Sequence, residues 1–432
     1  MALKDLTLTD VIAAAETVEE LDIPVIIVND LLLRLLYNEG QVSLSRATEV
    51  IRVHGHVLDS LLQQMQYEHM VEVASAGVVG RMSYVYSLTE EGRARAREAF
   101  ERSAYVGPAP LSLERYSQAI LMQTEQAEVV RPETVRQALS DLVLPDNFHR
   151  RIGPAINAGH SLFLYGPPGN GKSTIAASIA RLLSGESPIW LPYAVTVAGQ
   201  IITIFDPLIH RSASLPPERA ALLNVDRRWG LFYRPAVTVG GELTLDALEL
   251  RYDEVAKFYE APLQMKANGG MFLIDDFGRQ RISPAALLNR WIVPLESRVD
   301  YLRLRTGQTM QVPFRQFLVF STNLDPQDLV DDAFLRRIQV KVAVTRPDER
   351  MFYQIFTRVC EQLNLPFDRD SFVHLLQRWY REPQRKLQAV HPRDILSIVA
   401  AMCEYEGQPR HMTPELIDDA CESYFVKEAS AM

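Results

Sequence analysis

Hydrophobic and polar positions change their spacing three times along the chain. Between residues 25 and 103, leucine and methionine recur at helical spacing through three stretches, and residues 71–88 then alternate around a glycine-containing turn. Residues 161–345 alternate short apolar runs with helical stretches, which is typical of an α/β domain. Residues 346–432 are mostly helical in pattern. The pattern therefore predicts three structural parts.

The first part resembles a winged helix-turn-helix module. Three helices precede a two-stranded wing, and "YSLTEEGR" follows the second wing strand as it does in many such modules. We expect the first helix to begin at Asn29 as a capping residue and to end at Gly40. After this part, "YVGPAPLS" at residues 105–112 contains two prolines, which predicts a linker.

The charge of this module bears on whether it binds DNA or a protein. Residues 1–105 carry nine Lys/Arg against sixteen Asp/Glu, although the whole chain of 432 residues has a net charge of only −9. The third helix contains His54, His56, Asp59 and Glu68 but no Lys or Arg. Phosphate neutralisation by cations supplies most non-specific DNA affinity. Docking of a protein is therefore favoured over DNA binding, which stays open.

Composition, cysteine spacing and the absence of long apolar runs indicate the compartment of the protein. The chain is 47% hydrophobic and 23% charged, as in ordinary water-soluble globular proteins. Its three cysteines lie far apart without metal-ligand spacing, and the amino terminus lacks the apolar core of a signal peptide. No apolar run is long enough to span a bilayer. We expect a cytoplasmic protein.

A glycine-rich turn between a predicted strand and a predicted helix carries the chemistry. "YGPPGNGKST" matches G-x-x-x-x-G-K-[ST], a phosphate-binding loop in which backbone N–H groups surround phosphate oxygens at a helix N-terminus. Lys172 is expected to reach the β- and γ-phosphates and Ser173 to bind magnesium. The predicted ATP-binding residues here are Gly166, Pro167, Pro168, Gly169, Asn170, Gly171, Lys172, Ser173 and Thr174.

A second motif, "FLIDDFG", ends an apolar strand on two adjacent acids. In a phosphate-loop protein such a strand delivers an acid to the metal, so Asp275 is expected to hold Mg²⁺ and Asp276 to polarise the attacking water. Its last three letters also match the Asp-Phe-Gly of protein kinases. The order of motifs excludes a kinase, because the nearest match to the catalytic loop, "HPRD", follows this motif.

With these motifs, residues from about 142 to 425 resemble an AAA+ ATPase. "LVLPDNF" is similar to the family's approach to the loop, which places Leu144 and Pro145 near the adenine. "FLVFSTNLDP" resembles the strand of sensor 1, which maps onto Asn323. "DLVDDAFLRRIQVKV" resembles the segment of the arginine finger, for which Arg337 is preferred over Arg336. "HPRDIL" is similar to the helix that carries the sensor-2 arginine, here Arg393.

The resemblance implies a fold, a ligand and an assembly. It implies an α/β P-loop core of the AAA+ type with a C-terminal helical lid, binding ATP and Mg²⁺ in a homo-oligomeric, hexameric ring that remodels an unidentified protein client. The expected segments are a winged-helix-like domain at 1–104, a linker with connecting helices at 105–140, a nucleotide-binding core at 141–345 and a lid at 346–432.

The chain departs from the family pattern in two places. Asp276 stands where most members have Glu, and residues 185–268 form a long stretch that includes the second sheet strand and an inserted element. Within it, "RRWGLFYRP" fits a docking surface or a structural brace equally. Two alternative functions therefore stay open: an ATP-switched DNA-binding regulator, and a nucleotide-gated scaffold with weak hydrolysis.

Overall fold

The computed structural model describes residues 7–76, 80–125, 129–145, 147–159, 161–185, 187–216, 218, 223–329 and 335–425. These residues pack into two compact units. The first comprises Met1–Val129, Leu183–Leu273 and Gln280–Leu318, and the second comprises Val130–Leu182, Ile274–Arg279 and Val319–Met432. This grouping differs from the predicted segments, because the inserted stretch joins the amino-terminal module in one unit.

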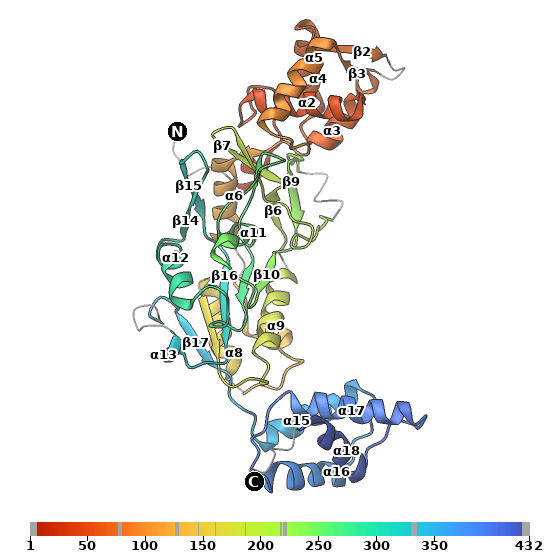
Figure 1. The fold of residues 1–432 in the computed structure, drawn as a ribbon, viewed down its shortest axis with the longest axis vertical. Helices are drawn as coiled ribbons and strands as arrows, with labels where there is room; N and C mark the ends of the chain where they lie inside the picture. Colours follow the sequence, from red (N-terminus) through yellow and green to blue (C-terminus); the bar gives the residue numbers. More distant parts are fainter. Residues whose placement is uncertain are drawn as a thin grey trace. The chain divides into compact units, whose positions relative to one another are not determined.

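The amino-terminal module has the order of elements expected from the sequence (Figure 1). It consists of α2 (Val25–Glu39), β1 (Gln41–Ser43), α3 (Leu44–Ile51), α4 (Gly55–Tyr67), β2 (Val71–Ser75), β3 (Val85–Leu88) and α5 (Glu90–Arg102). The strands form an antiparallel sheet in the order β1-β3-β2. Helix α2 ends at Gly40, with φ 77°, as predicted. The predicted start at Asn29 is wrong, because the N-cap is Pro24, five residues earlier, and Asn29 lies inside the helix.

The stretch after this module packs into the same core. Tyr105 and Ala109 are buried in one cluster with Leu31, Leu35 and Ile51. The backbone N–H of Ala109 donates to Ile51 O at 2.7 Å. Strand β4 (Leu111–Ser112) then pairs in parallel with β7 (Ala194–Val197) of the inserted stretch. The two prolines therefore shape an ordered connection.

The inserted stretch forms its own sheet in the first unit. Its strands follow the order β11-β12-β8-β7-β4, with β8 (Gln200–Thr203), β11 (Arg251–Asp253) and β12 (Phe258–Glu260). Strands β6 (Ile189–Pro192) and β9 (Trp229–Phe232) pair separately and antiparallel. The other elements of the unit are α1 (Leu8–Ile12), α6 (Leu113–Glu125), η2 (Leu245–Leu248), α11 (Leu263–Lys266), α12 (Pro284–Ser297), β14 (Val299–Arg303) and β15 (Thr309–Pro313). Strands β14 and β15 form an antiparallel hairpin, with Gly307 at φ 89°.

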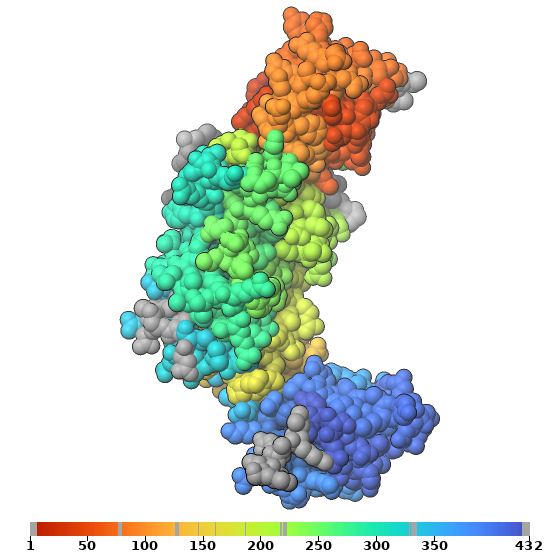
Figure 2. Space-filling model, in the orientation of Figure 1, coloured from red at the N-terminus to blue at the C-terminus, as the bar shows by residue number. Residues whose placement is uncertain are grey.

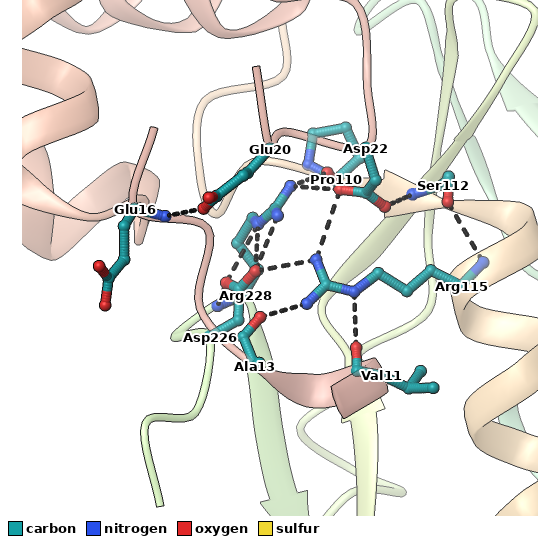
Figure 3. A network of polar contacts seen from close by, with 10 residues as sticks. All are labelled: Val11, Ala13, Glu16, Glu20, Asp22, Pro110, Ser112, Arg115, Asp226 and Arg228. Carbon is teal, nitrogen blue, oxygen red and sulfur yellow. Dashed lines mark hydrogen bonds and ion pairs between the residues drawn. The ribbon is translucent and has the colours of Figure 1, made fainter. Parts of the chain in front are cut away.

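A buried charge network joins three segments of the first unit (Figure 3). Arg228 is 1% exposed and binds Asp226 at 2.7 Å and Asp22 at 3.1 Å. Arg115 binds Asp226 at 3.1 Å and also donates to the carbonyls of Val11 and Ala13. Arg228, the second residue of "RRWGLFYRP", is therefore a structural brace.

A five-stranded sheet carries the sequence motifs. Its order is β10-β13-β16-β5-β17, with β10 (Ala236–Val239), β13 (Met271–Ile274), β16 (Phe317–Thr322), β5 (Ser161–Tyr165) and β17 (Val340–Ala343). Figure 1 labels β10, β16 and β17 of this sheet. Strands β5 and β17 pair in parallel, with Leu162 opposite Val340. Helices α7 (Pro132–Ala138), α8 (Phe148–Ala158), α9 (Lys172–Gly185) and α13 (Pro326–Leu329) complete this α/β part. It is the α/β P-loop core that the sequence predicts.

The last part of the chain is helical, as predicted. It contains α15 (Glu349–Gln362), α16 (Arg369–His374), a π-helical turn η3 (Leu375–Arg381), α17 (His391–Tyr405) and α18 (Pro414–Tyr424). Phenylalanines of α15 and α16 pack with Leu375, Ile395 and Ile417 in one core. Figure 2 shows the surface of this segment in blue. Among the described helices, none is long and apolar enough to cross a membrane.

Candidate functional site

The glycine-rich turn lies between β5 and α9, where the sequence places it. Gly166 has φ 139°, and a Cβ there would lie 2.3 Å from Val344 O. Gly169 has φ 73°, and a Cβ would lie 2.5 Å from Gln388 Oε1. Side chains are excluded at both positions by backbone conformation and by space. The loop backbone therefore borders the neighbouring cavity directly.

A cavity of about 430 Å³ opens beside this loop, within the second unit. One side is the loop and the first turn of α9, including Gly171, Lys172 and Ser173. The opposite sides come from the strand ends at Asp275, Asp276 and Asn323, from residues 141–144 and from the lid. Most predicted site residues therefore gather around one space, and Leu144 lies in its wall as expected.

Lys172, Asn323 and Asp276 form a chain of hydrogen bonds along this cavity. Lys172 Nζ donates to Asn323 Oδ1 at 2.5 Å, and Asn323 Nδ2 donates to Asp276 Oδ1 at 2.9 Å. Lys172 is 6% exposed and also donates to the carbonyls of Gly166 and Pro167. Burial lowers the pKa of the Lys172 ammonium, and the carboxylates of Asp275 and Asp276 oppose this shift.

Asp276 has an unusual backbone for a residue with a side chain. Its φ is 49°, in the left-handed region, and its N–H donates to Asp275 Oδ1 at 3.0 Å. Aspartate and asparagine tolerate this region better than other side chains, because their short polar groups bond to the local backbone. The conformation gives a physical reason for aspartate at a position where the sequence comparison leads one to expect glutamate.

The lid contacts the loop through its backbone. Val390 N donates to Gly169 O at 2.9 Å, and Ala389 N donates to Asn170 Oδ1 at 3.2 Å. Arg393 lines the cavity three residues later. Its guanidinium binds Asp394 at 3.1 Å and stays 69% exposed. The predicted sensor-2 arginine thus lies on the cavity wall, and the Asp394 carboxylate orients its exposed guanidinium.

The predicted arginine finger lies elsewhere. Arg337 precedes β17 and is not among the described residues that line the cavity, and neither is Arg336. Asp331 and Asp332, which precede these arginines in the same segment, lie outside the described residues. The cavity as described therefore contains no finger arginine from this segment.

Sequence reasoning missed one wall of the cavity. Ile355, Arg358, Val359 and Gln362 of α15 line it, and Arg358 donates to Ser140 O at 2.8 Å. The amphipathic pattern of this helix predicts a buried face but does not distinguish a core from a ligand wall. The apolar side chains of this wall, Ile355 and Val359, form with Leu142–Leu144 a surface suited to a flat apolar group.

The residues present fit a triphosphate and a hard cation. The loop amides and Lys172 offer donors to anionic oxygens, and Ser173 and Thr174 are exposed at the start of α9. The Ser173 hydroxyl and the Asp275 carboxylate are oxygen ligands, the type that Mg²⁺ prefers. Among the described residues, no group of three or more His, Cys, Asp and Glu side chains suggests a separate metal centre.

Two family models match parts of the chain. The model for magnesium chelatase, subunit ChlI, matches residues 139–189, which contain the phosphate loop. A domain of unknown function (DUF8689) matches residues 348–423, which are the helical lid segment. The curated protein "AAA-ATPase At3g28610" of Arabidopsis thaliana is 32% identical over 112 residues, covering 24% of this chain and 23% of that protein. The match thus spans less than a quarter of that relative's length.

The chain is similar to solved structures at lower sequence identity than to this curated relative. NtrX from Brucella abortus is 13% identical, over 79% of this chain and 62% of its own, with a TM-score of 0.37. A RuvB mutant from Thermotoga maritima is 14% identical, over 73% of each chain, also with a TM-score of 0.37. At these scores the likeness carries no argument about ligands or assembly.

Proposed function

We propose that this chain, a P-loop ATPase of the AAA+ type, binds ATP with Mg²⁺, hydrolyses it and uses the cycle to remodel a protein partner. The observation that carries the proposal is the hydrogen-bonded chain from Lys172 through Asn323 to Asp276 beside the glycine loop. It brings residues from three separate motifs to one cavity wall. Chance matches to single motifs do not produce such a convergence.

Each residue has a role that its chemistry supports. The loop amides and Lys172 hold the phosphates, and Ser173 and Asp275 hold Mg²⁺, which when bound neutralises charge on the β- and γ-phosphates. Lys172 has its ammonium 3.0 Å or less from three oxygens. It therefore exchanges a protein acceptor for a phosphate oxygen when nucleotide enters.

Asp276 and Asn323 act on the attacking water. The Asp276 carboxylate is exposed at the cavity and accepts the proton or orients the water, as a general base requires. Asn323 fixes that carboxylate through its amide N–H at 2.9 Å. A fixed acceptor holds the water in line with the γ-phosphorus, and positioning of this kind is the main source of catalysis in phosphoryl transfer.

Assembly into a ring completes the site in this proposal. Arg337 lies outside the described cavity lining of its own chain, which is compatible with a role in the neighbouring subunit's site. An arginine placed there stabilises charge on the transferring phosphoryl group. The ring of several subunits, with six as the expected number, is therefore part of the catalytic unit.

The amino-terminal module recruits the client. Arg81, the wing arginine, binds Asp59 of α4 at 2.8 Å, so its charge is offset locally. Together with the acidic composition of residues 1–105, this pairing favours a protein partner over the DNA phosphate backbone.

The solution mass of Asp276→Asn tests the proposal. This variant keeps the shape and the left-handed backbone preference of the residue but removes the base, so ATP stays bound. We expect light scattering to report assembly into a closed ring on addition of ATP and Mg²⁺. Lys172→Ala, which lacks the phosphate contact, is the control and should stay at its nucleotide-free mass. If Asp276→Asn binds ATP yet stays monomeric, the ring and the trans arginine are wrong.

A further inference from the structure

A second cavity lies in the first unit, away from the phosphate loop. It has a volume of about 630 Å³ and lies between the start of α4 and residues 224–228 of the inserted stretch. The volume is within the range of small-molecule sites, roughly 300–1,000 Å³. None of the roles assigned above uses it.

The walls of this cavity are more positive than the module around them. Four arginines line it, Arg52, Arg81, Arg227 and Arg228, against two aspartates, Asp59 and Asp226. Both aspartates are already paired, with Arg81 at 2.8 Å and Arg228 at 2.7 Å. Among the described residues, Arg52 and Arg227 form no ion pair. Two uncompensated cations therefore face one cavity in an otherwise acidic part of the chain.

The guanidinium of Arg52 is oriented by its backbone conformation and by a neighbouring aromatic ring. It has φ 61° at the end of α3, and its guanidinium lies 4.2 Å from the centre of the Tyr193 ring. Stacking on an aromatic ring orients a guanidinium while leaving its N–H edge available to an anion. Arg227 is an exposed neighbour of the buried Arg228, so the charge network fixes its backbone.

Backbone and side-chain donors add to the cations. Helix α4 begins without a side-chain cap, and its first residues, Gly55 and His56, line the cavity. Trp229 is 3% exposed, and its Nε1 has no acceptor among the described residues. It lines an adjoining hollow that shares Thr48, Arg52 and Arg227 with the cavity. A buried donor without an acceptor is rare in proteins and points to a missing acceptor.

Part of the remaining wall is apolar, beside the polar side chains of Thr48, His54 and Asn224. Leu21, Leu44, Val53 and Met82 line the same space. A site with a few convergent cations and an apolar floor suits an organic anion better than a bare ion.

We propose that this cavity binds a small phosphate-bearing organic anion, held by Arg52 and Arg227 at the start of α4. The site is separate from the phosphate loop, so its ligand is an effector and not the substrate. Its walls come from the amino-terminal module and from the inserted stretch, and ligand binding therefore couples these two segments of the first unit.

The test is carried out on full-length Lys172→Ala, which lacks the phosphate contact of the first site, with pyrophosphate as the probe. We expect calorimetry to report one pyrophosphate per chain. Arg227→Gln and Arg52→Asn, which keeps the left-handed preference, should each weaken binding by about tenfold or more, as loss of a charge-assisted contact does. Arg95→Gln on the exposed face of α5 is the matched control and should leave the affinity unchanged.

Tryptophan fluorescence locates the site independently. Pyrophosphate should change the emission of the Lys172→Ala chain, and Trp229→Phe should remove that change. Absence of binding, or equal affinity in all three arginine variants, overturns the proposal. A duplex DNA that binds more tightly than pyrophosphate, and that loses affinity in Arg227→Gln, overturns it in favour of a nucleic-acid surface. Neither result bears on ATP hydrolysis at the phosphate loop.

Discussion

Lys172 Nζ and Asn323 Oδ1 lie 2.5 Å apart, and the amide of the same asparagine donates to Asp276 at 2.9 Å. The side chain that we propose to hold phosphate and the one that we propose to orient water are therefore connected through a single amide. A change at either end alters the other, because the amide cannot rotate without breaking one of the two bonds.

Asn323→Ala should separate binding from hydrolysis. The substitution leaves the loop amides and Lys172 in place but removes the hydrogen bond from Asn323 to the Asp276 carboxylate. We expect a fall in kcat of about a hundredfold, with ATP affinity changed by less than about threefold. Steady-state phosphate release and nucleotide titration measure the two quantities. A double variant with Asp276→Asn should be no slower than Asp276→Asn alone, and an additive loss would contradict the coupling.

Asp276→Glu should harm this chain although glutamate is the usual residue in the family. At φ 49° a longer side chain costs about 1 kcal/mol more than aspartate. We expect a lower thermal midpoint than in Asp276→Asn, and no gain in kcat, because the longer carboxylate loses the bond from Asn323. A Glu variant that is both as stable and faster would show that the backbone does not select the residue.

Arg228→Met should destabilise the first unit. The arginine is buried, binds Asp226 and Asp22, and donates to Pro110 O at 3.1 Å. Its loss leaves Asp226 and Asp22 to share Arg115, at 3.1 Å and 3.5 Å, and removes the buried cation between them, which costs on the order of 3 kcal/mol. Urea unfolding followed by fluorescence measures the change. Arg227→Met, one residue earlier and exposed, is the matched control and should shift the free energy of unfolding by less than about 0.5 kcal/mol.

His391 should make the stability of the lid depend on pH. Burial lowers its pKa from 6.5 to about 4, with Arg385 acting in the same direction and Asp394 opposing. Its Nδ1 accepts from the Tyr380 hydroxyl at 2.9 Å when the ring is neutral. Between pH 6.5 and 4 the unfolded chain binds more protons than the folded one, so the free energy of unfolding falls as the pH drops.

Thermal midpoints measured across that interval test this dependence. His391→Gln should flatten the profile, because glutamine does not titrate. His149→Gln, outside the lid, is the control and should keep the slope of the unmodified chain. An unchanged slope in His391→Gln would assign the acid sensitivity to other groups.

The phosphate site was predictable because its chemistry restricts both residue type and spacing. Glycines at positions with positive φ, a lysine and a hydroxyl leave little freedom, and the cavity unites Gly169, Lys172, Asp275 and Asn323 as expected. The order of the motifs along the chain also predicted the core sheet. Such a loop can be predicted locally because its residue types and backbone angles are set within a few consecutive positions.

Other features of the structure depend on contacts between residues far apart in the sequence, which a local pattern does not predict. The Arg228 brace was indistinguishable from an exposed docking residue, since its partners Asp22 and Asp226 come from separate segments. The cavity wall formed by α15 could not be predicted either, because it also depends on contacts between separate segments. The start of α2 was misplaced because Asn29 is a good cap in isolation, whereas Pro24 begins the helix in this chain. The roles of Arg337 and Arg393 in catalysis remain predictions.

The connection through β4 has a consequence for the history of this chain. Ala104 N donates to Ala256 O at 2.7 Å, Ala109 N donates to Ile51 O at 2.7 Å, and Leu111 pairs with Val195. A recombination event that joined a foreign amino-terminal domain at residue 105 would keep the pairing of Leu111 with Val195 but break the other two links and expose the apolar surface beneath them. We therefore expect the module and the inserted stretch to have been inherited together, as one piece that diverges by mutual adjustment.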